Sequence, residues 1–154
     1  MTSAIEIKLA ELGVSLPDAP AAAGNYVPYV IAGDMVYISG QISMDASGLI
    51  KGKLGDDYTV DQGMAAAKTC AINLLTQLKV ACDGDLDRLV QVVKLGGFVN
   101  STSDFVDQPK VINGASDFFV AALGDIGRHA RAAVSAPSLP MGVAVEIDGV
   151  FQIK

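Results

Sequence analysis

Two charged side chains near the end of the sequence, Arg131 and Glu146, have the chemistry of a catalytic pair. They lie in apolar segments, 128–134 and 143–148, which a turn-rich stretch connects. Each segment has the length and composition of a short β-strand, in which successive side chains alternate between two faces. If the strands are neighbours, one presents an arginine that can grip a carboxylate and the other a glutamate that can move a proton. The alternative is a cross-strand salt bridge without chemistry.

Short motifs around these residues resemble the signatures of one family. Ala130-Arg131 is followed by Leu139-Pro140 and Val145-Glu146-Ile147, and Ser39-Gly40-Gln41-Ile42 follows an apolar run much earlier. In this order they resemble the Rid family (YjgF, reactive intermediate deaminase; formerly endoribonuclease L-PSP), from about residue 26 to residue 153. The resemblance implies an α+β, chorismate-mutase-like fold, with a mixed β-sheet packed on two long helices. It also implies a homotrimer with a pocket at each subunit interface.

The resemblance gives roles to residues in the last two predicted strands. Arg131 matches the arginine that grips the substrate carboxylate, and Glu146 matches the glutamate that positions or activates water. Ala133 stands where well-studied members have a cysteine, which puts the identity of the substrate in question. His129 shares the strand face of Arg131 and is expected to be a rim or packing residue.

Four further residues match the family's pocket. Tyr26, Ser39 and Asn113 match a tyrosine, a serine and an asparagine of the family's pocket. Each could equally be a hydrogen-bond partner of nearby backbone. Gly40 would let the backbone approach a ligand closely, or it would mark a bulge in a strand.

The composition narrows the function. The net charge is −6 and no run is rich in Lys or Arg, so a ribonuclease function and nucleic-acid partners are disfavoured. Charged residues make up 18% of the chain, against a usual ~25%, and we interpret the apolar excess as surface buried between subunits. Cys70 and Cys82 lack metal-ligand spacing. The charged N-terminus is not that of a signal peptide and no membrane span is expected, which favours the cytoplasm.

The length of 154 residues predicts one domain over residues 1–154, and the residue pattern predicts that residues 1–20 form a short N-terminal helix and a connector. A hairpin is expected around Gly33, with strands over 26–31 and 35–39, and residues 43–60 are expected to be a loop. Two long helices should follow, one beginning at Asp61 and the other near Pro109, with a strand over 90–99 between them.

The sequence leaves two functions open. The first is a hydrolase of C=N bonds, of the 2-iminobutanoate/2-iminopropanoate deaminase type, which releases a 2-oxo acid and ammonia with no metal or organic cofactor. The second is a noncatalytic trimer that binds small carboxylates or acts like a chaperone. The expected partners are therefore a small carboxylate or imino acid and further copies of the chain.

Overall fold

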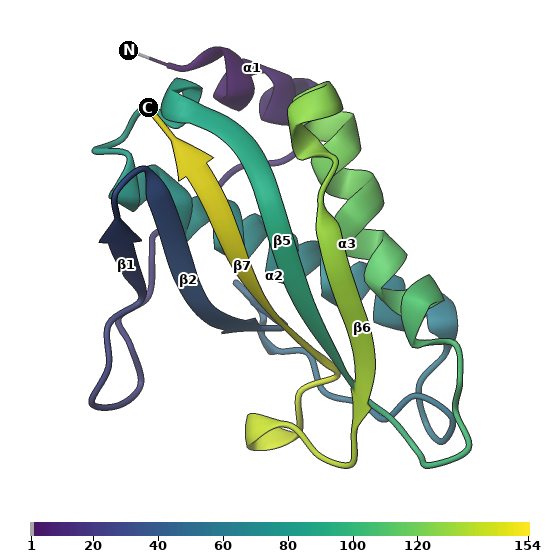
Figure 1. Ribbon diagram of the computed structural model, residues 1–154. Helices are drawn as coiled ribbons and strands as arrows, with labels where there is room; N and C mark the ends of the chain where they lie inside the picture. The colour runs from purple at the N-terminus through teal and green to yellow at the C-terminus, as the bar shows by residue number, and fades with distance from the viewer. Residues whose placement is uncertain (1) are drawn as a thin grey trace.

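Two long helices lie against one face of a five-stranded sheet in the computed structural model, which describes residues 2–154 (Figure 1). The helices are α1 (Ala4–Glu11), α2 (Val60–Ala81) and α3 (Gln108–Leu123). The sheet strands are β1 (Tyr29–Ala32), β2 (Met35–Ile42), β5 (Leu89–Asn100), β6 (Ala130–Ala136) and β7 (Val145–Ile153). Three 3₁₀ turns are η1 (Leu86–Arg88), η2 (Gly124–Gly127) and η3 (Pro140–Gly142). The α+β architecture predicted from the sequence is confirmed.

Capping side chains explain where α1 and α2 begin. Ser3 caps α1 and Thr59 caps α2, and each forms a capping box with Glu6 or Gln62 three residues later. The apolar stripe of α2 is fully buried, and it consists of Ala67, Cys70, Ala71, Leu74, Leu75 and Leu78. The apolar side of α3 is likewise buried, through Val111, Ala115, Phe118, Phe119 and Ala122. These two stripes pack on the sheet and form the core.

The strand order is β1-β2-β7-β5-β6, with β5 and β6 parallel and the other neighbours antiparallel. Side chains of the helix-covered face are buried, such as Val36 and Ile38 of β2. Tyr37 lies between them and projects from the opposite face, as its alternation predicts. Gly33 connects β1 to β2 with φ +64°, a left-handed conformation that glycine adopts without strain.

The last two strands are not neighbours, and this corrects the sequence-based hypothesis. Consecutive strands usually pair, but here β5 lies between β6 and β7 and forms hydrogen bonds with both. Arg131 is opposite Leu95 of β5, whereas Glu146 is opposite Phe98, three residues farther along that strand. A direct cross-strand contact between the two charged residues is therefore excluded within one chain.

Two segment predictions also need correction. The 43–60 stretch is not all loop, because β3 (Met44–Asp45) and β4 (Gly48–Leu49) form a small hairpin within it. The first run was predicted to begin at Tyr26, but β1 begins at Tyr29, so Tyr26 lies in the connector before it. Both differences involve short segments whose hydrogen bonds depend on tertiary neighbours rather than on local pattern.

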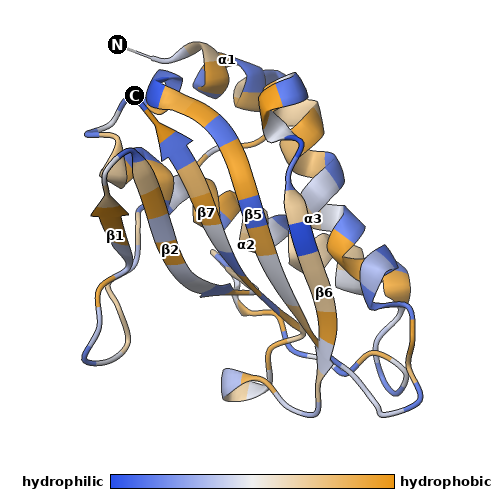
Figure 2. Ribbon diagram, viewed as in Figure 1, coloured by the Kyte–Doolittle hydropathy of each residue, from blue (hydrophilic) through white to orange (hydrophobic). Residues whose placement is uncertain are grey.

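The face of the sheet away from α2 and α3 carries exposed apolar side chains. Val30, Tyr37, Phe98 and Val134 are 36–54% exposed on four different strands. Figure 2 shows apolar stretches along these strands, and no helix lies over the side that faces the viewer. Val30 pairs with Tyr37, and Phe98 pairs with Val134, so these side chains form two exposed apolar clusters. Exposed apolar clusters on an uncovered sheet face favour an interaction surface. In residues 2–154, no helix combines the length and apolar character that a bilayer span requires.

Gly114 tests how α2 and α3 pack. A methyl group at this position would overlap the backbone carbonyl of Met64 on α2. Helix propensity alone predicts that Gly114→Ala stabilises the protein by up to about 1 kcal/mol. We expect the opposite sign, a loss of about 1–3 kcal/mol, because the helices must move apart. Urea unfolding at one fixed protein concentration measures the change, with exposed Asp117→Ala on the same helix as a control expected to stay within about 0.5 kcal/mol.

Candidate functional site

The Arg131 side chain lies on the helix-covered face of edge strand β6, where α3 holds it. One terminal nitrogen, Nη1, donates to Ser116 Oγ at 3.0 Å, and Nη2 donates to the Pro109 carbonyl at 3.2 Å. Both acceptors are neutral, and within residues 2–154 the guanidinium forms no salt bridge. Arg131 is half-buried. A positioned arginine without a counter-ion is suited to bind a carboxylate.

The Glu146 side chain lies on the opposite face of the sheet. Its neighbours in β7, Val145 and Ile147, are fully buried toward the helices, so alternation turns Glu146 away from them. The β2–β7 pairing is irregular between Ile38 and Gln41, and Gly40 lies in this bulge. A Cβ on Gly40 would overlap the Glu146 carboxylate, because the carboxylate carbon would be only 3.0 Å away. The glycine therefore makes room for the acid.

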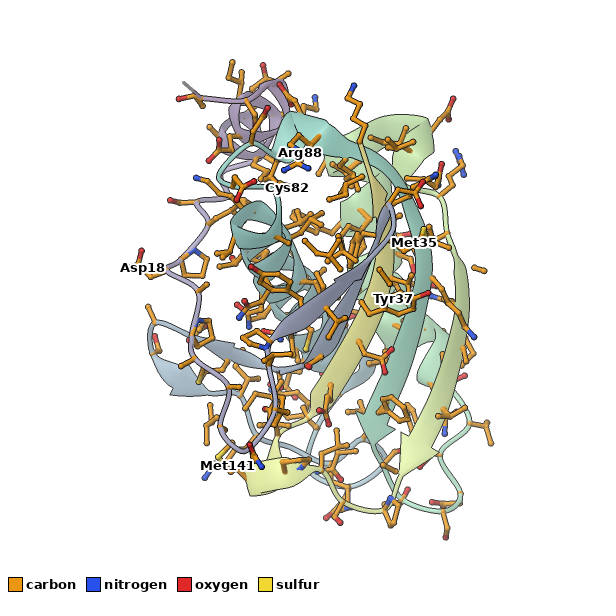
Figure 3. The ribbon with its side chains drawn as sticks, turned by 60° about the vertical axis from the view of Figure 1, so that its left-hand side comes forward. Asp18, Met35, Tyr37, Cys82, Arg88 and Met141 are labelled. Atoms are coloured by element: carbon orange, nitrogen blue, oxygen red, sulfur yellow. The ribbon has the colours of Figure 1, made fainter. Side chains whose placement is uncertain are left out.

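A cavity of about 490 Å³ adjoins Glu146. Its lining includes Tyr26, Ser39 and Gly40, so four of the predicted site residues meet there. Residues 20–23 of the connector and Met141 of η3 form apolar walls. Figure 3 shows the connector, which carries Asp18, running along the edge of the sheet toward the turn with Met141. β1 pairs only with Met35–Ile38, so residues 39–42 of β2 have no neighbouring strand on that side. The cavity lies beside these residues.

Most polar groups at the cavity are engaged in holding its walls. Ser39 Oγ donates to the Val27 carbonyl at 2.8 Å, which is the local backbone contact that was the alternative for this serine. Asn73 donates to the carbonyls of Ile42 and Met44, and Gln77 donates to that of Pro20. Because these donors are satisfied, Glu146 is the group at the cavity that is best placed to act on a ligand.

The electrostatics of Glu146 favour proton transfer. Burial raises the pKa of its carboxyl group, and the nearby negative charge of Asp148 raises it further. Burial also raises the pKa of Asp148, partly offset by the Gly96 N–H and by Lys94. A glutamate whose pKa lies above its usual range is closer to the value that a general acid or base needs near neutral pH.

The other predicted residues belong to the Arg131 side. Asn113 is on α3, one turn from Ser116, and does not line the cavity beside Glu146. Ala133 pairs with Gly97 of β5 and packs against the core two residues after Arg131. His129 does not merely pack at the rim, because its Nε2 lies 2.9 Å from Ser116 Oγ. The predicted site is thus divided between edge strand β6 with α3 on one face of the sheet and central strand β7 with the cavity on the other.

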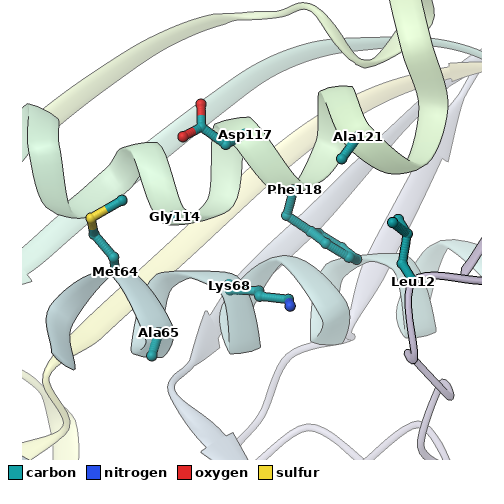
Figure 4. Close-up of a pocket in the computed structure, with 8 residues that line it drawn as sticks. All are labelled: Leu12, Met64, Ala65, Lys68, Gly114, Asp117, Phe118 and Ala121. Atoms are coloured by element: carbon teal, nitrogen blue, oxygen red, sulfur yellow. The ribbon is translucent and has the colours of Figure 1, made fainter. Parts of the chain in front are cut away.

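A second hollow, of about 400 Å³, lies between α2 and α3 beside Leu12, and it contains none of the predicted residues (Figure 4). Lys68 and Asp117 are its charged residues, and Lys68 Nζ lies 5.7 Å from the centre of the Phe118 ring. Among residues 2–154 we find no group of three or more His, Cys, Asp or Glu side chains with metal-binding geometry. Both cysteines are free and buried.

Comparison with known proteins identifies the family. Residues 6–148 match the family described as "YjgF/chorismate_mutase-like, putative endoribonuclease". The chain belongs to the Rid/YjgF family. Protein TCP17 of Trypanosoma cruzi is 45% identical to it over 97% of this chain and 94% of its own length. A crystal structure of an Agrobacterium tumefaciens protein of unknown function shares 46% identity, covers 97% of this chain and 94% of its own, and superposes with a TM-score of 0.90.

A relative with a stated activity is more distant. The 2-iminobutanoate/2-iminopropanoate deaminase of Bos taurus is 30% identical over 89% of this Rid/YjgF chain and 86% of its own. The chain thus shares its family with deaminases.

Sequence reasoning missed two residues of the site. Asp148 could have been found, because it follows Glu146 by two positions and must share its strand face. Ser116 gave no such signal: a serine in an amphipathic helix is ordinarily solvated, and only the fold brings it to Arg131 and His129.

The raised pKa of Glu146 predicts how stability depends on pH. A carboxyl group whose pKa is raised by folding stabilises the protein below its unfolded value of about 4.3, and this contribution is lost as the pH rises through the folded-state pKa. Glu146→Gln removes this loss. We therefore expect its melting temperature, relative to the wild type, to increase as the pH rises from about 4 toward neutral.

Exposed Glu11→Gln on α1 controls for removing a carboxylate. Thermal unfolding followed by circular dichroism across this pH range measures both variants. A Glu146→Gln difference that does not change with pH would contradict the assigned environment of this carboxyl group.

Proposed function

We propose that this protein is a homotrimeric imine and enamine deaminase whose pocket lies between subunits. One observation carries the proposal: Arg131 has no counter-ion among residues 2–154, and Glu146 adjoins a cavity on the opposite face of the same sheet. Neither face alone has both the carboxylate grip and the proton-transfer group. A second copy that presents its β6 edge to the cavity would combine them.

The uncovered sheet face supports assembly. Tyr37 and Val134 are 49% and 46% exposed, and burying such side chains between subunits would stabilise an oligomer by about 25 cal/mol per Å² of apolar area. Closed symmetry is the usual form of self-association, and the family resemblance favours a trimer. Light scattering should therefore give a mass near three times 15.9 kDa.

In the proposed reaction, Arg131 binds the carboxylate of a 2-imino acid through N–H groups that Ser116 and Pro109 leave free. Glu146, deprotonated, accepts a proton from a water molecule whose oxygen attacks the imine carbon. The imine nitrogen takes up a proton as the oxygen attacks, which gives a carbinolamine. Its hydroxyl proton is then transferred to nitrogen, for example through Glu146, as the C–N bond breaks, which leaves a 2-oxo acid and ammonia. An enamine first gains a proton at carbon and loses one from nitrogen, and it enters as the imine. No redox step is involved.

The main alternative is a trimer that binds small carboxylates without turnover. It shares Arg131 as the binding residue but gives Glu146 no chemical role. Ribonuclease chemistry remains disfavoured by the net charge of −6.

Glu146→Gln separates catalysis from binding. We expect the variant to assemble and to bind 2-oxo acids, while imine hydrolysis falls by roughly 10²–10⁴-fold, the usual contribution of a general acid or base. The assay couples a serine or threonine dehydratase, which makes the short-lived enamine, to timed release of the 2-oxo acid. As a control, Glu11→Gln removes an exposed carboxylate of α1 outside the cavity and should retain the wild-type activity. Full acceleration by assembled Glu146→Gln would remove Glu146 from the reaction, and no acceleration by the wild type would favour the binder.

A further inference from the structure

His129, Ser116 and Arg131 form a chain of hydrogen bonds that ends on a backbone carbonyl. His129 Nδ1 lies 2.6 Å from the Gly127 carbonyl oxygen, and His129 Nε2 lies 2.9 Å from Ser116 Oγ. Ser116 Oγ in turn receives Arg131 Nη1 at 3.0 Å. We call this set the arginine relay. It joins α3, η2 and β6, three consecutive elements of the chain.

The direction of every bond in the arginine relay follows from the chemistry of its ends. A carbonyl oxygen can only accept, so the proton of the neutral imidazole must be on Nδ1. Nε2 is then an acceptor, and the Ser116 hydroxyl donates to it. A guanidinium can only donate, so the serine oxygen accepts from Arg131. All donors and acceptors are therefore matched once, and no alternative direction fits.

The surroundings of His129 favour this neutral form. Burial and the nearby charge of Arg131 lower the pKa of the imidazole, although the Gly127 carbonyl acts in the other direction. The ring packs edge-on against Phe119 at 5.9 Å, and Phe119 is fully buried. Gly127 allows η2 to lie close to Phe119, because any Cβ at this position would overlap the backbone of Phe119. The ring is thus held by packing as well as by hydrogen bonds.

We propose that His129 and Ser116 are positioning residues that fix the Arg131 guanidinium for the carboxylate of the ligand. The proposal rests on the proposed function, in which Arg131 binds that carboxylate. A long arginine side chain loses much rotamer freedom when it binds. The arginine relay and the Pro109 carbonyl use two of the five guanidinium N–H groups and leave three for the ligand. The Arg131 side chain is therefore partly ordered before the ligand binds, which reduces the entropy lost on binding.

The test measures the affinity of the assembled protein for pyruvate by calorimetry. Ser116→Ala removes the middle of the arginine relay and should weaken binding roughly 5-fold, the effect of one neutral hydrogen bond. Ser116→Thr keeps the hydroxyl and should restore most of the affinity. For turnover, the same loss should appear in KM with kcat nearly unchanged, because the carboxylate contact is present in ground and transition states alike.

Two histidine variants make the test specific. In His129→Gln the amide can reach the position of Nε2 and should preserve affinity, whereas His129→Asn can replace only Nδ1 and should lose roughly 5-fold. Ser116→Ala combined with His129→Asn should also lose roughly 5-fold rather than 25-fold, because both changes break one chain. Thr69→Val, which removes a hydroxyl that bonds only within α2, is the control and should bind as the wild type.

The Arg131→Ala background identifies the origin of any effect. Once the guanidinium is absent, Ser116→Ala should change the remaining affinity less than 2-fold. In addition, ¹⁵N NMR should place the His129 proton on Nδ1, and Ser116→Ala should speed exchange of the Arg131 Nη signals. Wild-type affinity in both Ser116→Ala and His129→Asn, or equal losses with and without Arg131, would overturn the proposal. Unchanged affinity in Arg131→Ala alone would instead refute the proposed function on which it rests.

Discussion

The position of β5 between β6 and β7 is the constraint on which the rest of the molecule depends. It pairs with both strands that carry the charged residues, so Arg131 and Glu146 cannot neutralise each other within one chain. Arg131 is held against α3 by neutral acceptors, and Glu146 lies on the other face beside a cavity and a second carboxylate. Among residues 2–154 of one subunit neither charge has an ion-pair partner. Such charges are costly to bury alone, but they are available to a ligand that carries a carboxylate and a basic nitrogen.

The same constraint connects assembly to function. The helices cover one sheet face, and the other exposes apolar side chains such as Tyr37 and Phe98 next to Glu146 and Asp148. Closing this face with further subunits would remove apolar area from water and, at the same time, lower the dielectric around the carboxylates. Desolvation of this face would therefore both strengthen the apolar association and raise the pKa of Glu146 further. The chain belongs to the Rid/YjgF family, and its distant relatives include proteins named 2-iminobutanoate/2-iminopropanoate deaminase.

Much of the fold could be predicted from sequence because it depends on local pattern. The buried stripes of α2 and α3 and the caps Ser3 and Thr59 are visible as spacing of residue types. The order of the strands could not be predicted in this way, since alternation shows which face a side chain occupies but not which strand lies beside it. For the site, Arg131 and Glu146 carried recognisable motifs, whereas Ser116 became significant only when the fold brought α3 to β6. His129 was expected to be a rim or packing residue, because the sequence does not show that Ser116 lies beside it.

The central claim is that each site takes Arg131 from one subunit and Glu146 from its neighbour, and subunit mixing tests it most directly. Arg131→Ala and Glu146→Gln proteins, each nearly inactive alone, are unfolded together in equal amounts, refolded and assayed for imine hydrolysis. Random assembly of a cyclic trimer places both wild-type residues at about a quarter of the sites, so activity should recover to about a quarter of that of the wild type treated in the same way. If mass spectrometry shows mixed trimers but no activity is recovered, a site shared between subunits is contradicted.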